Sequence, residues 1–178
     1  METKQTKTQT EIKMYERTYG EKHDNSMDIK DIAKAVRQDI KDAQKAKTLP
    51  RMKVSVTIER YSGGQSLNLN IKEFPIQFIN IYRMKLQTEN SNVFVGNLPD
   101  EHPAYELYTP LAKKALETLK SMVGSYNYDG SETMTDYFDV NFYSHIGFDW
   151  KYQGNHEKEL AEKADSINWP NLWSDFLN

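Results

Sequence analysis

The segment between residues 126 and 139 holds the densest group of side chains that could do chemistry. Its fourteen residues include four carboxylates and three tyrosines, which are Tyr126, Tyr128, Asp129, Glu132, Asp136, Tyr137 and Asp139. Asp129, Ser131 and Thr133 fit the alternating ligands of a calcium loop only loosely, and no later acid completes the twelve-residue pattern. General acid–base catalysis would need a carboxylate in a dry pocket beside a partner. We predict turn chemistry at Asp129-Gly130 or a partner-binding surface, with no metal ligand and no catalytic residue.

Other catalytic signatures are missing from the chain. There is no cysteine, which excludes disulfides, zinc–thiolate sites and thiol nucleophiles. The four histidines lie far apart in the sequence and lack the spacing of metal ligands: His23, His102, His145 and His156. No Ser-His-Asp context, Walker loop or dinucleotide glycine fingerprint occurs. We therefore expect no cofactor, and we predict that His145 is a partly exposed sheet residue.

A row of basic residues at helical spacing forms a second candidate surface. Its members recur at intervals of three and four residues: Lys30, Lys34, Arg37, Lys41 and Lys45. The row either contacts nucleic acid or an acidic protein, or is a solvated face whose charges form ordinary surface pairs. Residues 26–60 carry nine Lys/Arg against five Asp/Glu, whereas residues 125–150 carry no Lys/Arg and five Asp/Glu. This asymmetry either orients a partner by long-range attraction or is surface scatter.

The basic row belongs to a predicted helix from Asp28 to Ala46. Apolar residues at the same spacing draw a second stripe along it: Ile29, Ile32, Ala33, Val36, Ile40 and Ala43. Ser26 or Asp28 can cap the start of this helix, and Pro50 prevents its continuation.

A β-hairpin follows the helix, and its turn is a third candidate contact. Apolar and polar residues alternate from Met52 to Arg60 and from Ser66 to Lys72, which predicts two strands. Between them, Tyr61 precedes Gly63 and Gly64, whose glycines permit the positive φ angles of a tight turn. Such a turn can also cradle a phosphate, although no helix N-terminus follows it.

The remaining elements of the chain are predicted from shorter sequence patterns. We predict a further strand around residues 76–82 and a long loop from Gln87 to His102, which is a candidate contact surface. A second helix begins at Pro110, with Thr109 as its cap, and ends at Gly124. The last predicted elements are a strand from Tyr137 to Ile146, a short helix from Glu157 to Asp165, and two tryptophans, Trp169 and Trp173, that either dock back or anchor a partner.

These elements predict an α+β fold in the order helix, strand, strand, helix, strand. Two amphipathic helices on one face of a small antiparallel sheet would bury every apolar stripe. We divide the chain into a polar N-terminal arm (residues 1–25), the α+β domain (26–150) and a C-terminal extension (151–178). No apolar run suffices to span a bilayer or to form a signal peptide, so we expect a cytoplasmic protein with no membrane contact. The net charge of −3 argues against a protein built mainly to coat nucleic acid.

Several short stretches carry a resemblance to a known family. They are Asp31–Arg37, Val54–Val56 leading to Tyr61–Gly64, Tyr126-Asn127, and Asp136–Tyr143. Over residues 28–146 they resemble the small domain associated with large polyvalent proteins of phages and conjugative elements, which also occurs alone in accessory proteins of mobile elements. Residues 84–108 and both termini depart from the compact pattern. Some stand-alone small acidic proteins of such elements in Gram-positive bacteria are anti-CRISPRs that act on Cas9, so the resemblance implies a counter-defence role.

The leading hypothesis is therefore a mobile-element protein that inhibits a host Cas9–guide RNA complex by stoichiometric binding in the bacterial cytoplasm. One alternative is a nucleic-acid-binding accessory module that contacts RNA or DNA through the basic helix and the hairpin. Another is a metal-dependent nuclease that uses Asp129, Asp136 and Asp139. The partner-binding candidates are Lys34, Arg37, Lys41, Tyr61, Gly63, Gly64, Tyr128, Asp129, Asp136, Tyr137 and Asp139.

Overall fold

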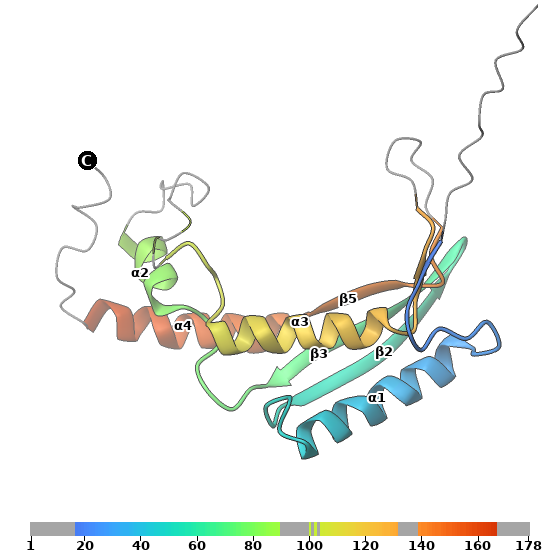
Figure 1. Ribbon diagram of the computed structural model, residues 1–178. Helices are drawn as coiled ribbons and strands as arrows, with labels where there is room; N and C mark the ends of the chain where they lie inside the picture. Colours follow the sequence, from blue (N-terminus) through green and yellow to red (C-terminus); the bar gives the residue numbers. More distant parts are fainter. Residues whose placement is uncertain (1–16, 90–99, 101, 103, 132–138, 167–178) are drawn as a thin grey trace, which may run out of the picture.

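The computed structural model describes residues 17–89, 100, 102, 104–131 and 139–166. Four helices and five strands follow one another along this part of the chain (Figure 1). In order they are β1 (Thr18–Tyr19), α1 (Ile29–Lys45), β2 (Lys53–Tyr61), β3 (Gly64–Glu73), α2 (Ile81–Glu89), α3 (Pro110–Gly124), β4 (Tyr128–Asp129), β5 (Tyr143–Phe148) and α4 (Trp150–Ser166). The α+β class predicted from the sequence is confirmed.

The main sheet has three strands in the order β2-β3-β5. Strands β2 and β3 form the predicted antiparallel hairpin, in which Ile58 pairs with Leu67. The third strand, β5, lies parallel to β3, with Leu69 opposite Ile146, so the prediction of a wholly antiparallel sheet is wrong. The reason is the connection, because the chain passes through α2 and α3 between these two strands. Such a helical crossover returns the chain in the same direction, as parallel pairing requires.

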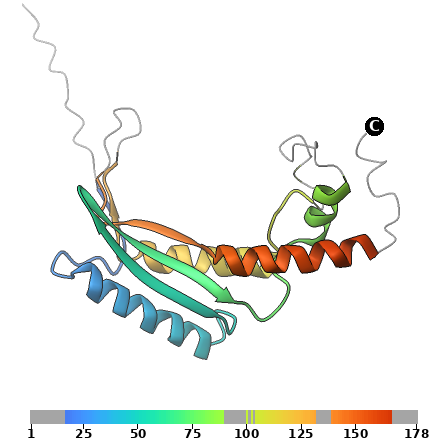
Figure 2. The same ribbon diagram turned by 180° about the vertical axis from the view of Figure 1, so that it is seen from behind.

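One face of this sheet carries the core. Its register aligns Val56, Leu69 and Ile146 on the face that α1 and α3 cover, as the two opposite views show (Figures 1 and 2). The predicted stripe of α1 is buried at Ile29, Ile32, Ala33, Val36 and Ile40, and that of α3 at Ala112, Ala115, Leu116, Leu119 and Val123. The alternate strand residues, such as Thr57 and His145, are exposed on the opposite face.

The ends of α1 are set by local chemistry. Asp28 caps its start, since its carboxylate accepts a hydrogen bond of 2.8 Å from the backbone N–H of Lys30. The same carboxylate binds Arg60 at 2.6 Å, which ties the tip of the hairpin to the first turn of the helix. At the other end Lys47 adopts a φ of 60°, and this left-handed residue turns the chain before Pro50 is reached.

Two of the remaining predictions need correction. The strand predicted at residues 76–82 is wrong, because Ile79 forms a single bridge to Tyr108 and the helix α2 begins at Ile81. The strand predicted from Tyr137 to Ile146 begins only at Tyr143, because the side-chain amide of Asn127 bonds both backbone groups of Phe142 and turns the chain there.

The C-terminal helix is longer than the sequence indicated. It begins at Trp150, because Asp149 accepts hydrogen bonds from the backbone N–H groups of Lys151 and Tyr152 and so caps it. The helix α4 packs against α2 (Figure 2). The ring of Phe78 stacks on Phe148 at 4.0 Å and on His156 at 4.4 Å. The tryptophans predicted to dock or to anchor a partner lie outside the described residues, as does most of the loop predicted at 87–102. Within the described chain, no helix combines the length and apolar character needed to cross a membrane.

Candidate functional site

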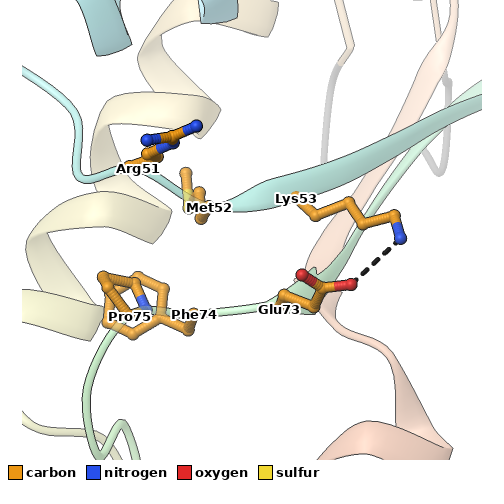
Figure 3. A pocket seen from close by; sticks show the side chains of 6 residues that line it. All are labelled: Arg51, Met52, Lys53, Glu73, Phe74 and Pro75. Atoms are coloured by element: carbon orange, nitrogen blue, oxygen red, sulfur yellow. Dashed lines mark hydrogen bonds and ion pairs between the residues drawn. The ribbon is translucent and has the colours of Figure 1, made fainter.

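Three adjoining hollows run along α1 and the hairpin. The first, of about 480 Å³, lies on α1 and shares Arg37 and Lys41 with the second, of about 270 Å³, which lies between α1 and β2. The second shares Met52 and Lys53 with the third, of about 400 Å³, at the open end of the hairpin (Figure 3). We call the three together the cationic trough, because five basic residues line it: Lys34, Arg37, Lys41, Arg51 and Lys53.

The trough exists because α1 lies along the outer edge of the sheet. Strand β2 is the outermost strand, so carbonyls on its free side have no strand partner. The guanidinium of Arg37 donates to the carbonyl of Val56 at 2.6 Å, and the amide of Gln44 donates to that of Met52 at 2.7 Å. These two bonds hold the helix beside the strand. They leave four of the five N–H donors of Arg37 for other partners.

The charges of the trough are poorly balanced by the protein itself. Two acids, Asp31 and Glu73, line it beside the five basic residues, which gives a net charge of +3. Glu73 is bound by Lys53 at 2.9 Å, in a pair with both side chains about two-thirds exposed. Within the described part of the chain, no ion pair involves Lys34, Lys41 or Arg51, which are all exposed. The described residues therefore leave most of the positive charge of the trough without an acidic partner.

The hairpin turn is held by packing and lines none of these hollows. Gly63 has a φ of +87°, a conformation that favours glycine. A Cβ atom on Gly64 would come within 2.9 Å of the ring of Tyr61, which lies over it. The turn therefore has the structural role that its glycines predict.

Tyr128 and Asp139, from the described part of the acidic and aromatic segment, form a cluster with the described part of the N-terminal arm. Strand β1 pairs with β4, and the guanidinium of Arg17 binds the carboxylate of Asp139 at 2.7 Å. The same guanidinium lies 5.0 Å from the ring centre of Tyr128, whose hydroxyl donates to Asp139 at 3.3 Å. The hydrogen bond to Asp139 raises the pKa of Arg17 above its ordinary value. Asp139 is thus neutralised within the molecule.

The neighbouring residues of the arm are held just as firmly. The backbone N–H of Gly20 donates to Asn127 at 2.9 Å, and a Cβ on Gly20 would lie 2.3 Å from the carbonyl oxygen of Gly124. The ammonium of Lys22 binds Asp39 of α1 at 2.6 Å, which raises the pKa of Lys22. Residues 17–25 are therefore docked on the domain, and the rest of the predicted arm lies outside the described residues.

The remaining candidates have local roles or are not described. Asp129 accepts a hydrogen bond of 2.8 Å from the backbone N–H of Ser131, which is the turn chemistry predicted there. Asp136 and Tyr137 lie outside the described residues. His145 is an exposed residue of β5, as predicted, with its Nδ1 3.1 Å from the side-chain oxygen of Asn68. Among the residues that are described, no group of three His, Asp or Glu side chains is arranged to hold a metal ion.

Sequence reasoning brought Lys34, Arg37 and Lys41 together correctly but missed the second half of the trough. Arg51 and Lys53 stand in a different element, and a helical period does not reach them. The only sequence signal was the alternation in β2, which turns Lys53 away from the core.

Comparison with known proteins identifies no relative: no protein family model, no curated protein and no solved structure matches this chain. The resemblance to the domain of polyvalent proteins therefore stays a prediction.

Proposed function

We propose that this chain is a stoichiometric binding protein that holds the sugar–phosphate backbone of a nucleic acid in the cationic trough. The observation that carries this proposal is the run of exposed cations along one continuous hollow surface, among which Lys34, Lys41 and Arg51 have no ion pair in the described structure. Cations held close together repel one another, so a cluster of them in excess over acids favours binding an external anion.

The length of the trough favours a chain of phosphates over a single small anion. The part of α1 that lines it runs from Asp31 to Gln44, which corresponds to roughly 20 Å at 1.5 Å per residue. A single phosphate or carboxylate would touch one or two of these cations and leave the others unpaired. A nucleic-acid strand presents one charge after another along its length, and Lys34, Arg37 and Lys41 likewise follow one another along one helix face.

The small number of cations sets the strength of binding. Four basic residues of the trough lack an acidic partner within the described structure, which are Lys34, Arg37, Lys41 and Arg51. Four phosphate contacts correspond to a slope of about −3 in a plot of log K against log salt for a single strand. The rest of the molecule is acidic, since the net charge of the chain is −3, so binding is confined to this surface.

Fluorescence anisotropy with a labelled 20-nucleotide RNA tests the proposal. We expect binding that weakens with salt at about this slope, and on the order of 100-fold weaker binding for the double variant Lys34→Glu/Lys41→Glu at low salt. Lys120→Glu on α3 is the matched control, because Lys120 is exposed and lines none of the three hollows. Salt-independent binding, or equal loss in the control, would contradict the proposal. An acidic peptide of equal charge that competes fully with the RNA would point to an acidic protein instead.

We further propose that the nucleic acid is presented by a host Cas9–guide RNA complex in the bacterial cytoplasm, which is what the resemblance of the sequence implies. The supporting observations are the motif-bearing stretches Asp31–Arg37 and Val54–Val56, because both contribute residues to the trough. DNA cleavage by a purified Cas9–guide complex is the assay. We expect inhibition at near-equimolar protein and its loss in Lys34→Glu/Lys41→Glu. No binding to the complex at micromolar concentration would remove this partner and leave the binding of free RNA untouched.

A further inference from the structure

The hollow at the open end of the hairpin differs in chemistry from the rest of the trough. Its lining combines apolar Met52, Phe74 and Pro75 with Arg51 and the Lys53–Glu73 pair (Figure 3). The other two hollows have no aromatic side chain and no proline in their linings, and the apolar part of the second consists of Ile40, Met52, Val54 and Val56. From this difference we propose that the hollow is a subsite for one unpaired nucleobase, with guanine preferred, of the strand whose phosphates occupy the trough. The inference rests on the proposed function.

The apolar part of the hollow is rigid. Met52 and Phe74 are each only 8% exposed, so they are fixed parts of the core that show one surface. The ring of Phe74 packs edge-to-face on that of Phe148, with 5.6 Å between the ring centres. The backbone N–H of Phe74 donates to the hydroxyl of Tyr152 at 2.9 Å. A flat apolar wall that does not need to be ordered on binding suits a planar ring, because a preformed site loses little entropy.

The size of the hollow fits a base. Its volume of about 400 Å³ lies at the small end of the range for ligand sites, roughly 300–1,000 Å³. Bases inside a duplex are stacked and paired, and extruding one costs a few kcal/mol. The subsite therefore predicts that the trough prefers a single strand over a duplex.

The polar rim indicates which base fits best. Glu73 accepts one hydrogen bond, from Lys53, and a carboxylate has about four acceptor positions, so most of its capacity is free for a donor. Guanine offers two adjacent N–H donors on its Watson–Crick edge, which two carboxylate oxygens can accept together, whereas uracil and adenine do not present this pair. Arg51 is exposed beside the apolar wall, and its planar guanidinium can stack on a base.

Binding of labelled 12-nucleotide RNAs to the full chain tests the subsite. The probes are oligouridine, the same strand with one central guanine, and the same strand with inosine in place of guanine, which lacks the 2-amino donor. We expect the guanine strand to bind about tenfold tighter than oligouridine, since hydrogen bonds to a charged group are stronger than those between neutral groups. Inosine should lose most of that gain, and a duplex of the same length should bind more weakly than the guanine strand.

The variant Glu73→Gln separates the subsite from the trough. It removes a negative charge, so it should bind oligouridine more tightly than the original protein, and it should lose the preference for guanine over inosine. Lys120→Glu should change neither property. Equal affinity for all three strands, together with salt-dependent binding that Lys34→Glu/Lys41→Glu abolishes, would overturn the subsite while the proposed function stands. Absence of binding to every probe would overturn both.

Discussion

The cationic trough and the cluster around Asp139 are both dense in charge, and they differ in where the counter-charges lie. In the cluster, Arg17 binds Asp139 at 2.7 Å and the nearby Lys22 binds Asp39 at 2.6 Å, so these two acids have basic partners brought from the N-terminal arm. In the trough, Lys34 and Lys41 extend from α1 toward solvent without an ion pair in the described structure.

This difference separates charges that fold the chain from charges that the fold leaves available. These two ion pairs tie the N-terminal arm to the domain, across 122 positions of sequence for Arg17 and Asp139 and 17 positions for Lys22 and Asp39. Three cations of the trough, Lys34, Arg37 and Lys41, follow one another on a single helix, so their mutual repulsion destabilises the free protein slightly. A protein retains such a row at a cost in stability, and the compensation we infer is binding. Substitutions should therefore change stability in the cluster and affinity in the trough.

The largest expected effect on stability is that of Gly20→Ala, next to the cluster. A Cβ atom at this position would lie 2.3 Å from the carbonyl oxygen of Gly124, and backbone on both sides leaves little room to adjust. We expect a loss of about 2 kcal/mol in the free energy of unfolding, typical of overpacking, measured by urea denaturation. RNA binding by the folded protein should be unchanged. Gly154→Ala in α4 is the control, because a Cβ atom added there meets nothing within 4 Å. An equal loss of unfolding free energy in both variants would refute the firm docking of the arm.

Arg37 belongs to both classes of charge and gives the next largest effect. Arg37→Lys and Arg37→Gln both remove the 2.6 Å bond to the carbonyl of Val56, so each should lose about 1 kcal/mol of stability. Only Arg37→Gln removes the charge, so it should bind RNA more weakly than Arg37→Lys. Equal affinities for the two variants, measured by anisotropy at one salt concentration, would mean that this position contributes through packing alone.

The sequence predicted the fold correctly where the signal for a helix, strand or turn lies within that element itself. The stripe of α1 from Ile29 to Ile40 and the glycines at positions 63 and 64 each specify structure within a few residues of themselves, and both predictions agree with the structure. The direction of β5 was not predictable from its own residues, because it depends on the crossover through α2 and α3. Val140 shows the same limit. The alternation of apolar and polar residues around it predicted a strand of the main sheet, whereas in the structure Val140 forms a bridge to Asp129.

The candidate site was predictable to the same extent. Lys34, Arg37 and Lys41 share one helix and were grouped by spacing, whereas Arg51 and Lys53 join them only because α1 lies beside β2. Asp139 and Arg17 stand 122 positions apart, and nothing in either neighbourhood marks the other as its partner. Neutralisation of a charge by a distant residue is a tertiary property, so sequence alone did not reveal that Asp139 is paired within the molecule.

Lowering the pH tests a buried histidine that belongs to neither charged region. Burial lowers the pKa of His156, which stacks on Phe78 at 4.4 Å, below its usual value of 6.5. The unfolded chain then takes up the proton first, so stability is fully present above about pH 6.5 and falls as the pH drops below it. Thermal unfolding at pH 7.5 and 5.5 should detect this loss, and His156→Phe should reduce it, with the remainder due to buried His102, whose pKa is also lowered. A loss of equal size in His156→Phe would refute the assignment.

The smallest expected effect on stability, at the other end of the range from Gly20→Ala, is that of Lys34→Gln. Lys34 is exposed on α1 and has no ion pair in the described structure, so its neutral replacement should alter the free energy of unfolding by no more than about 0.5 kcal/mol. It should nevertheless weaken RNA binding and reduce the slope of log K against log salt by about 0.7, because one phosphate contact is lost. Asp139→Asn should do the reverse, lowering stability without changing that slope. If Lys34→Gln destabilised the protein as much as Asp139→Asn did, the lysine row would be part of the scaffold, and the distinction between the two charged regions would fail.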